Sequence, residues 1–355
     1  MIEYGRDPNV NVKLLNDVRV IFSDEFCIGK GSDGTRVYLG LSKDGYGKAV
    51  KRILQYNFID FAKKEMKIFN EIKEKNSTYL VNYSYFIKDT ETEWVYLILD
   101  LCEESLESFV HSSTMEDLQN SLPKILRHIL TGLADLHREP SSILHRNLKP
   151  SNVLYNAKGE FLIADFGLSR IMKNDGTTHA SIGNRGTPYW IAPESYCKDD
   201  ESFDQSSYKR ESDVMNAGLV AYYVATKGKH PFGSDECRLL NLFRGNPVGL
   251  KEIKDVQLKH LLSWMLQLNP KLRPSANEAL KHPFVLSDKE KFDMLCDLGN
   301  QPMTKISRLL HPPNSGGHMQ LNRQISWKDC INPEVLKLFN ERHYDFTWLG
   351  CVDFY

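Results

Sequence analysis

The chain has 355 residues, of which 41% are hydrophobic and 26% are charged, and its formal net charge is −1. This composition is typical of a soluble globular protein, and the length allows two or three domains of about 100–200 residues each. The near-zero charge argues against a role dominated by nucleic acid or an anionic membrane surface. No apolar run approaches the roughly 18 residues that a membrane-spanning helix needs, and the seven cysteines show no zinc-ligand spacing. We therefore expect a cytoplasmic chain with reduced thiols and no membrane segment.

The N-terminal third of the chain is predicted to be rich in strands. Residues 1–20 are polar, with many Asn and Asp, so we expect a tail or linker there. One amphipathic helix is predicted over residues 58–74, where apolar residues recur at helical spacing among many charges. The predicted strands are residues 21–29, 36–41, 47–54, 81–87 and 94–101.

After residue 103 the pattern becomes helical. The clearest helix is predicted over residues 121–137, where leucines and isoleucines form one stripe with a 3.6-residue period. Two more are predicted over 213–227, with Gly228 as its C-terminal cap, and over 257–269. Residues 287–355 read as a proline- and glycine-rich connector with one short helical segment at 333–341. The fold class predicted from this order is α+β, with a small β-rich lobe, a larger helical lobe and a short helical C-terminal extension.

Three glycines lie between the first two predicted strands, at Gly29, Gly31 and Gly34. Glycines at this spacing let backbone amides approach phosphate oxygens without a Cβ in the way. A plain hairpin turn is the alternative interpretation. The loop joins two strands instead of preceding a helix, which argues against a dinucleotide-binding fold.

A lysine and a glutamate follow at positions that suit the same chemistry. Lys51 comes after Ala49 on the third predicted strand, where a buried lysine can hold the α- and β-phosphates of a nucleotide. Glu65 lies in the next predicted helix, where it could pair with Lys51. Taken singly, each is an ordinary charged residue, and only their order along the chain favours a nucleotide site.

Two further motifs carry the catalytic prediction. Residues 145–152 read His-Arg-Asn-Leu-Lys-Pro-Ser-Asn, and residues 165–167 read Asp-Phe-Gly. Asp165 can bind a Mg²⁺ ion that bridges nucleotide phosphates, and Asn152 can supply a second metal contact. Lys149 lies in the same run, and Asn147 occupies the position at which a proton-accepting carboxylate is expected.

With these motifs in order, residues 21–286 resemble eukaryotic protein kinases of the serine/threonine type. The Gly-Thr at 186–187 before Ala-Pro-Glu at 192–194 supports that type. The resemblance implies a bilobal kinase fold, with an N-lobe over about 21–103 and a C-lobe over about 104–286, and ATP and Mg²⁺ as cofactors. By the same resemblance, the further nucleotide-binding residues are Val37, Ala49, Leu99, Asp100, Cys102 and Leu154.

A narrower similarity is to the group of kinase-endoribonucleases that contains the inositol-requiring unfolded-protein sensor and ribonuclease L. It rests on residues 31–38, 49–54, 101–106 and 280–284. In that group a helical nuclease domain follows the kinase, and residues 325–344 are similar to its opening. We therefore expect residues 287–355 to be a truncated start of a nuclease-like region, with no nuclease residue carried over and no RNA partner. Family members act as dimers, which implies a homodimer or a heterodimer with a full-length relative.

Asn147 leaves three hypotheses for function. An amide cannot accept a proton at neutral pH, and general-base help is worth about 10²–10⁴-fold in rate. We favour an ATP-binding pseudokinase or weakly active kinase that acts by nucleotide-dependent dimerisation or docking. The second hypothesis is an active kinase that phosphorylates a protein substrate or itself, with Ser169, Thr177, Thr178 and Ser181 as candidate sites and Arg146 as a phosphate partner. The third is an RNA-cleaving stress-response endoribonuclease.

Overall fold

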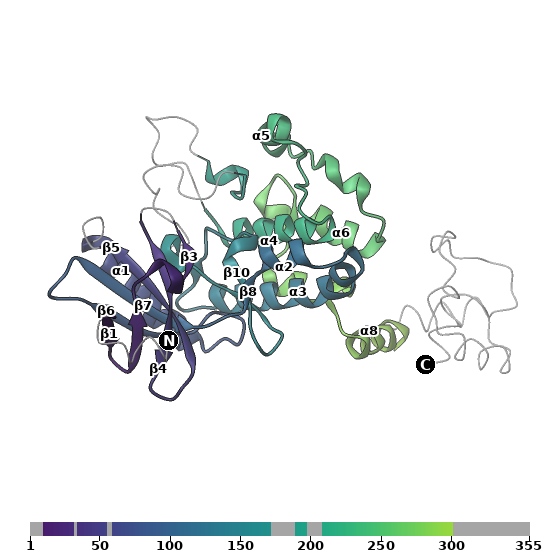
Figure 1. Ribbon diagram of the computed structural model, residues 1–355. Coiled ribbons are helices and arrows are strands. Elements are labelled where there is room, and N and C mark those ends of the chain that lie inside the picture. The colour runs from purple at the N-terminus through teal and green to yellow at the C-terminus, as the bar shows by residue number, and fades with distance from the viewer. Residues whose placement is uncertain (1–9, 32–33, 55–58, 172–188, 197–207, 301–355) are drawn as a thin grey trace, which may run out of the picture. The chain divides into compact units, whose positions relative to one another are not determined.

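The computed structural model describes residues 10–31, 34–54, 59–171, 189–196 and 208–300 (Figure 1). The chain divides into two units, Met1–Val285 and Leu286–Tyr355. In the second unit the described element is helix α8 (Asp288–Asn300). The helix predicted over 333–341 lies outside the described residues, as does every other position after Asn300.

In the first unit, the described residues of the N-terminal lobe form one antiparallel sheet of seven strands and one helix, α1 (Ile59–Lys75). The sheet order is β1-β2-β4-β5-β7-β6, and β3 pairs with β4 beside β2. The strands are β1 (Val12–Leu15), β2 (Val18–Ile21), β3 (Cys27–Lys30), β4 (Arg36–Ser42), β5 (Gly47–Leu54), β6 (Tyr83–Lys88) and β7 (Trp94–Asp100). The predicted helix 58–74 and the last four predicted strands match α1, β4, β5, β6 and β7 to within two residues at each end.

The N-terminal hairpin corrects the sequence analysis. A polar tail over residues 1–20 is wrong for residues 12–20, because β1 and β2 pair there across a turn at Asn16, whose φ is 54°. Val18 and Val20 are buried on one face of β2, as the two-residue period of a strand requires. The strand predicted over 21–29 is also interrupted, by a 3₁₀ turn at Asp24–Phe26.

The hairpin covers one face of the sheet. Its buried side chains pack against Tyr38, Val50 and Tyr96, which alternate with the residues of the opposite face. A Cβ at Gly40 would lie only 2.8 Å from a methyl carbon of Val18, so glycine is needed there for the hairpin to approach. The opposite face of the sheet is thereby left as the one that faces the helical lobe.

The C-terminal lobe is helical, and its described helices are α2 (Leu106–Ser112), α3 (Met115–His137), α4 (Arg210–Ala225), α5 (Asp235–Phe243), α6 (Val256–Met265) and α7 (Ala276–Ala279). Short strands accompany them: β8 (Glu104–Ser105), β9 (Ile143–Leu144), β10 (Val153–Tyr155), β11 (Phe161–Ile163) and β12 (Arg170–Ile171). Helix α3 begins six residues before the predicted start at 121, because Thr114 and Asp117 form a capping box upstream. Helix α4 ends as predicted near Gly228, whose φ is 106° and whose N–H donates to the Tyr223 carbonyl.

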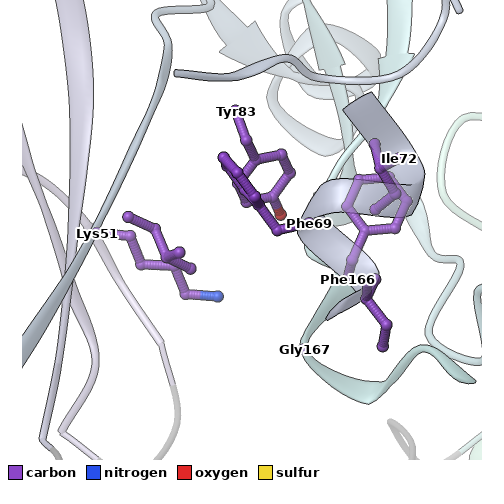
Figure 2. Close-up of a pocket in the computed structure, with 8 residues that line it drawn as sticks. Lys51, Phe69, Ile72, Tyr83, Phe166 and Gly167 are labelled. Atoms are coloured by element: carbon purple, nitrogen blue, oxygen red, sulfur yellow. The ribbon is translucent and has the colours of Figure 1, made fainter. Parts of the chain in front are cut away.

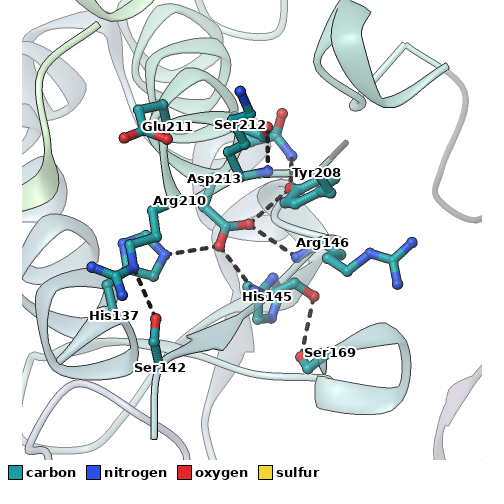
Figure 3. A network of polar contacts seen from close by, with 12 residues as sticks. His137, Ser142, His145, Arg146, Ser169, Tyr208, Arg210, Glu211, Ser212 and Asp213 are labelled. Carbon is teal, nitrogen blue, oxygen red and sulfur yellow. Dashed lines mark hydrogen bonds and ion pairs between the residues drawn. The ribbon is translucent and has the colours of Figure 1, made fainter. Parts of the chain in front are cut away.

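A buried carboxylate joins three segments of this lobe (Figure 3). The Asp213 side chain on α4 is fully buried. Its Oδ1 accepts from the Arg146 N–H at 2.9 Å and from the Tyr208 hydroxyl at 2.8 Å. Its Oδ2 accepts from the His145 N–H at 2.9 Å and lies 2.9 Å from Nε2 of His137, at the end of α3. The start of the 145–152 loop is therefore fixed to both helices.

Burial alone would raise the pKa of the Asp213 carboxyl. The hydrogen bond and charge of His137, with the backbone donors, outweigh burial, so the pKa lies below its ordinary value of 3.8. The carboxylate is thus ionised at neutral pH and acts as an acceptor for all four groups.

We expect Leu130→Ala on α3 to lower the free energy of unfolding by about 2–5 kcal/mol, because it removes buried methyl groups and leaves a cavity. Leu130 is 0% exposed. The matched control is Leu240→Ala on α5, where the side chain is 51% exposed, and it should change stability by less than about 0.5 kcal/mol. Urea denaturation measures both, and equal losses would contradict the placement of the core.

We expect Asp213→Asn to cost about 3–5 kcal/mol of stability at pH 7, because the buried donors lose their charged acceptor. A carboxyl whose folded-state pKa is lowered contributes stability above its unfolded-state pKa of 3.8, and this contribution is lost as the pH falls below that value. The difference between the native chain and the variant should therefore stay nearly constant above about pH 5 and shrink as the pH falls from about 4 to about 2. An unchanged difference across that range would rule out the charge as its source.

Candidate nucleotide-binding site

One face of the sheet carries the residues predicted to bind nucleotide. Directly paired residues of antiparallel strands share a face. Val37 pairs with Lys51, and Lys51 pairs with Leu97. Ala49 pairs with Leu99 on the same face, two residues along each strand. The register therefore brings four predicted site residues together and keeps them away from the face that the hairpin covers.

Lys51 reaches across to the Asp-Phe-Gly motif. Its Nζ lies 2.7 Å from Oδ1 of Asp165, so the structure joins two predicted site residues that are 114 positions apart. The positive charge of Lys51 is the main reason why the pKa of Asp165 is lowered from its ordinary value. Asp165 has φ 64° and ψ 74°, a left-handed conformation that is uncommon for a residue with a Cβ.

The 145–152 loop meets the same carboxylate from the other side. The Asn147 amide donates from Nδ2 to Oδ2 of Asp165 at 3.2 Å. The Asn152 amide donates from Nδ2 to the Asn147 carbonyl at 2.7 Å, and the Asn152 carbonyl accepts from the Ala164 N–H at 2.9 Å. Lys149 is half-buried in this loop. Asn147, Asn152 and Asp165 thus lie in one hydrogen-bonded group.

Three aromatic rings pack together next to Asp165. The Phe166 ring meets the His145 ring edge-on, with centroids 5.2 Å apart, and the Tyr83 ring at a tilt, with centroids 5.8 Å apart. These rings link the loop, the Asp-Phe-Gly motif and the sheet into one packed column. Figure 2 shows a pocket beside the column, with Lys51 on the strand side and Phe166 and Ile72 of α1 on the other.

The segment predicted to bind adenine is held at several points. The Asp100 N–H donates to the Asn82 carbonyl at 3.1 Å, and the Asp100 carboxylate accepts from Lys48 at 2.7 Å. Burial, and secondarily the charges of Asp100 and Glu103, raise the pKa of Cys102 to about 11, so this thiol stays protonated at neutral pH. The segment that would face an adenine ring is therefore tied to two neighbouring residues, Asn82 and Lys48, through Asp100.

The remaining predicted residues are only partly described. Gly29 lies on β3, and Gly34 has φ 75°, a conformation that suits glycine. The Gly31 N–H donates to the Thr35 carbonyl at 2.8 Å, while residues 32–33 lie outside the described ranges. Leu154 lies on β10, and Glu65 lies in α1. The Glu65 side chain is outside the description, so its ion pair with Lys51 stays a prediction.

Of the candidate phosphorylation sites, one is described. Ser169 is fully buried, and its hydroxyl donates to the His145 carbonyl at 3.1 Å, so another enzyme cannot reach it in this conformation. Residues 177, 178 and 181 lie outside the description. The sequence analysis missed the role of His137 and Tyr208 in holding Asp213. No local motif marks them, because His137 lies 76 positions from its partner.

The donor set fits a magnesium-bound nucleotide. Nowhere in the described part do three or more His, Cys, Asp or Glu side chains gather to hold a metal by themselves. Asp165 offers one carboxylate, and Asn152 offers an amide oxygen, because its nitrogen is used inside the loop. Mg²⁺ typically takes one or two carboxylates and completes its shell with phosphate oxygens and water.

Across the described ranges, every helix is too short or too polar to span a bilayer.

Comparison with protein families matches the protein kinase domain over residues 22–285. The chain is 32% identical over 295 residues to the serine/threonine-protein kinase/endoribonuclease ire-1 of Caenorhabditis elegans, covering 80% of this chain and 29% of the relative. It is 29% identical over 351 residues to IRE1 of Hypocrea jecorina, covering 87% of this chain and 27% of that relative. It is 30% identical over 294 residues to human IRE2, covering 79% of this chain and 30% of that relative.

The chain thus spans less than a third of the length of these curated relatives. The family match covers most of the chain, and it contains every residue predicted for the nucleotide site. The bilobal arrangement of an antiparallel sheet and a helical lobe agrees with it. The chain belongs to the protein kinase family, and within that family it is close to the serine/threonine-protein kinase/endoribonucleases of the IRE1 group.

Proposed function

We propose that this chain binds ATP with Mg²⁺ and acts chiefly by nucleotide-dependent dimerisation or docking, with little or no phosphoryl transfer. The observation that carries the proposal is the pair of contacts on Asp165. Lys51 and Asn147 bind its two carboxylate oxygens, which supports a site that can hold a nucleotide while the base position carries an amide.

Each described residue has a role in the bound state. Lys51 binds the α- and β-phosphates, and Asp165 with Asn152 binds the metal. The backbone between Asp100 and Cys102 binds adenine. When bound, Mg²⁺ neutralises charge on the phosphates. The glycine loop covers the phosphates with backbone amides, as its spacing between two strands suggests.

Asn147 limits the chemistry. Its nitrogen donates to Asp165, and its oxygen cannot take a proton from a substrate hydroxyl at neutral pH. Loss of a general base lowers the rate by about 10²–10⁴-fold, but transfer of a phosphoryl group depends mainly on positioning and charge. A slow residual reaction is therefore compatible with this site.

The alternative is an active serine/threonine kinase that phosphorylates itself or a protein substrate. The packed column of His145, Phe166 and Tyr83 favours it, because this column holds Asp165 in place beside Lys51. The missing base argues against it.

The IRE1-group relatives carry endoribonuclease in their names, which suggests a second alternative for a longer protein. We propose that residues 287–355 belong to a nuclease-like region. The proposed partners are a second copy of the chain or a full-length relative, in the cytoplasm.

We expect ATP with Mg²⁺ to shift the native chain toward a dimer in sedimentation velocity, and Lys51→Met to abolish the shift, because that variant loses the phosphate-binding charge. The matched control is Lys229→Met, an exposed lysine on the helical lobe whose partner Glu252 is also exposed. A native chain that binds ATP and stays monomeric, alone and with a full-length relative, would rule out the dimerisation proposal.

We expect labelled ATP to leave the native chain almost unlabelled and to label Asn147→Asp, because the substitution restores the base in an otherwise assembled site. The gain should be about 10²-fold or more. Lys51→Met serves as the blank. Strong labelling of the native chain above this blank would favour the active-kinase alternative instead.

A further inference from the structure

We propose that Asn147 allows this site to bind a nucleoside di- or triphosphate without a divalent cation. Asn147 acts as a positioning residue: where an aspartate would place a negative charge beside Asp165, its amide donates a hydrogen bond to Asp165. The inference rests on the proposed nucleotide site and concerns the form of nucleotide that the site accepts. It is carried by the geometry at Asp165.

The orientation of the amide follows from charge. Lys51 donates from Nζ to one oxygen of Asp165 at 2.7 Å, and an ammonium group paired this closely with a carboxylate leaves both carboxylate oxygens as acceptors. Only the nitrogen of Asn147 can face such an oxygen at 3.2 Å. The side chain therefore acts on Asp165 as a donor, and an aspartate of the same shape would bring two like charges into contact.

These contacts hold a strained residue. The left-handed backbone of Asp165 is uncommon for a residue other than glycine and persists where the surroundings fix it. Lys51 fixes one carboxylate oxygen and Asn147 fixes the other. Asp165 is thus held by protein donors on both oxygens, and it does not depend on a cation for its orientation.

The net charge around Asp165 also favours binding of phosphate groups without a cation. The charges of Lys51, Asp165 and Asn147 sum to zero, and the positive charge of Lys149 also acts on Asp165, whereas an aspartate at position 147 would add one negative charge beside Asp165. Phosphate groups that arrive without a cation would meet that charge at short range, where the effective dielectric constant is well below that of water. With an aspartate at position 147, a cation is needed to offset this repulsion when phosphates bind. The native chain, with Asn147, needs the cation much less.

The backbone at position 147 is held independently of its side chain. The carbonyl accepts from Asn152 at 2.7 Å, and the N–H donates to Nδ1 of His145 at 3.4 Å. Substitutions at this side chain should therefore leave the loop folded, and the melting temperature without nucleotide checks this for each variant.

The experiment measures the dissociation constant for ADP by calorimetry, in excess Mg²⁺ and in EDTA. For the native chain we expect the dissociation constant in EDTA to exceed that in Mg²⁺ by no more than about tenfold. For Asn147→Asp we expect an increase of about 100-fold or more, because the added negative charge repels the phosphates strongly at short range in a partly buried site. Asn147→Ala should lie between them, since it loses the donor and adds no charge. The control is Asn246→Asp, which adds the same charge at an exposed position after α5 and should behave like the native chain.

Two results would overturn the inference and leave the nucleotide site standing. One is a native chain that needs Mg²⁺ as strongly as Asn147→Asp does. The other is an Asn246→Asp chain with the same increase, which would make the effect one of net charge. A native chain that binds ADP under neither condition would overturn both this inference and the proposed function.

Discussion

The hydrogen bonds that Asp213 accepts from the backbone of His145 and Arg146 fix the loop on which the site is built. Because the carboxylate is fully buried and also contacts Tyr208 and His137, the loop cannot shift without leaving an uncompensated charge in the core. The positions of the later residues of this loop depend on that constraint. Asn147 follows directly in the chain and therefore arrives at Asp165 in a defined orientation.

The sheet and the helical lobe contribute to the site in different ways. The sheet supplies Lys51 through its register, and the two-residue period places the hairpin on the other face. The helical lobe supplies the loop and Asp165. The contact between Lys51 and Asp165 is where the two contributions meet, and the Phe166 ring below it ties the contact to the core. The proposed nucleotide site is therefore built from residues of both lobes.

Much of the fold could be predicted from the sequence, because its signals are local. The period of strand β5 and of helix α3, and the run that contains Asn147, can be read over a few neighbouring residues. The pairing of Lys51 with Asp165 was not predicted, since the two residues are 114 positions apart and the partner expected for Lys51 was Glu65. The N-terminal hairpin was missed because polar composition concealed a short alternation at Val18 and Val20. The contact between Asn147 and Asp165 could not be predicted at all, since it depends on side-chain geometry.

At the N-terminal hairpin, the boundary of the family match and the boundary of the folded lobe fall at different residues. The family match begins at residue 22, but strands β1 and β2 lie before it and bury their valines against Tyr38 and Tyr96. A chain shortened to residues 22–285, the region of the family match, would expose an aromatic sheet face and an unpaired edge of β4, which are features that promote aggregation. The lobe that carries Lys51 therefore includes two strands that precede the region of the family match, and these strands cover its aromatic face.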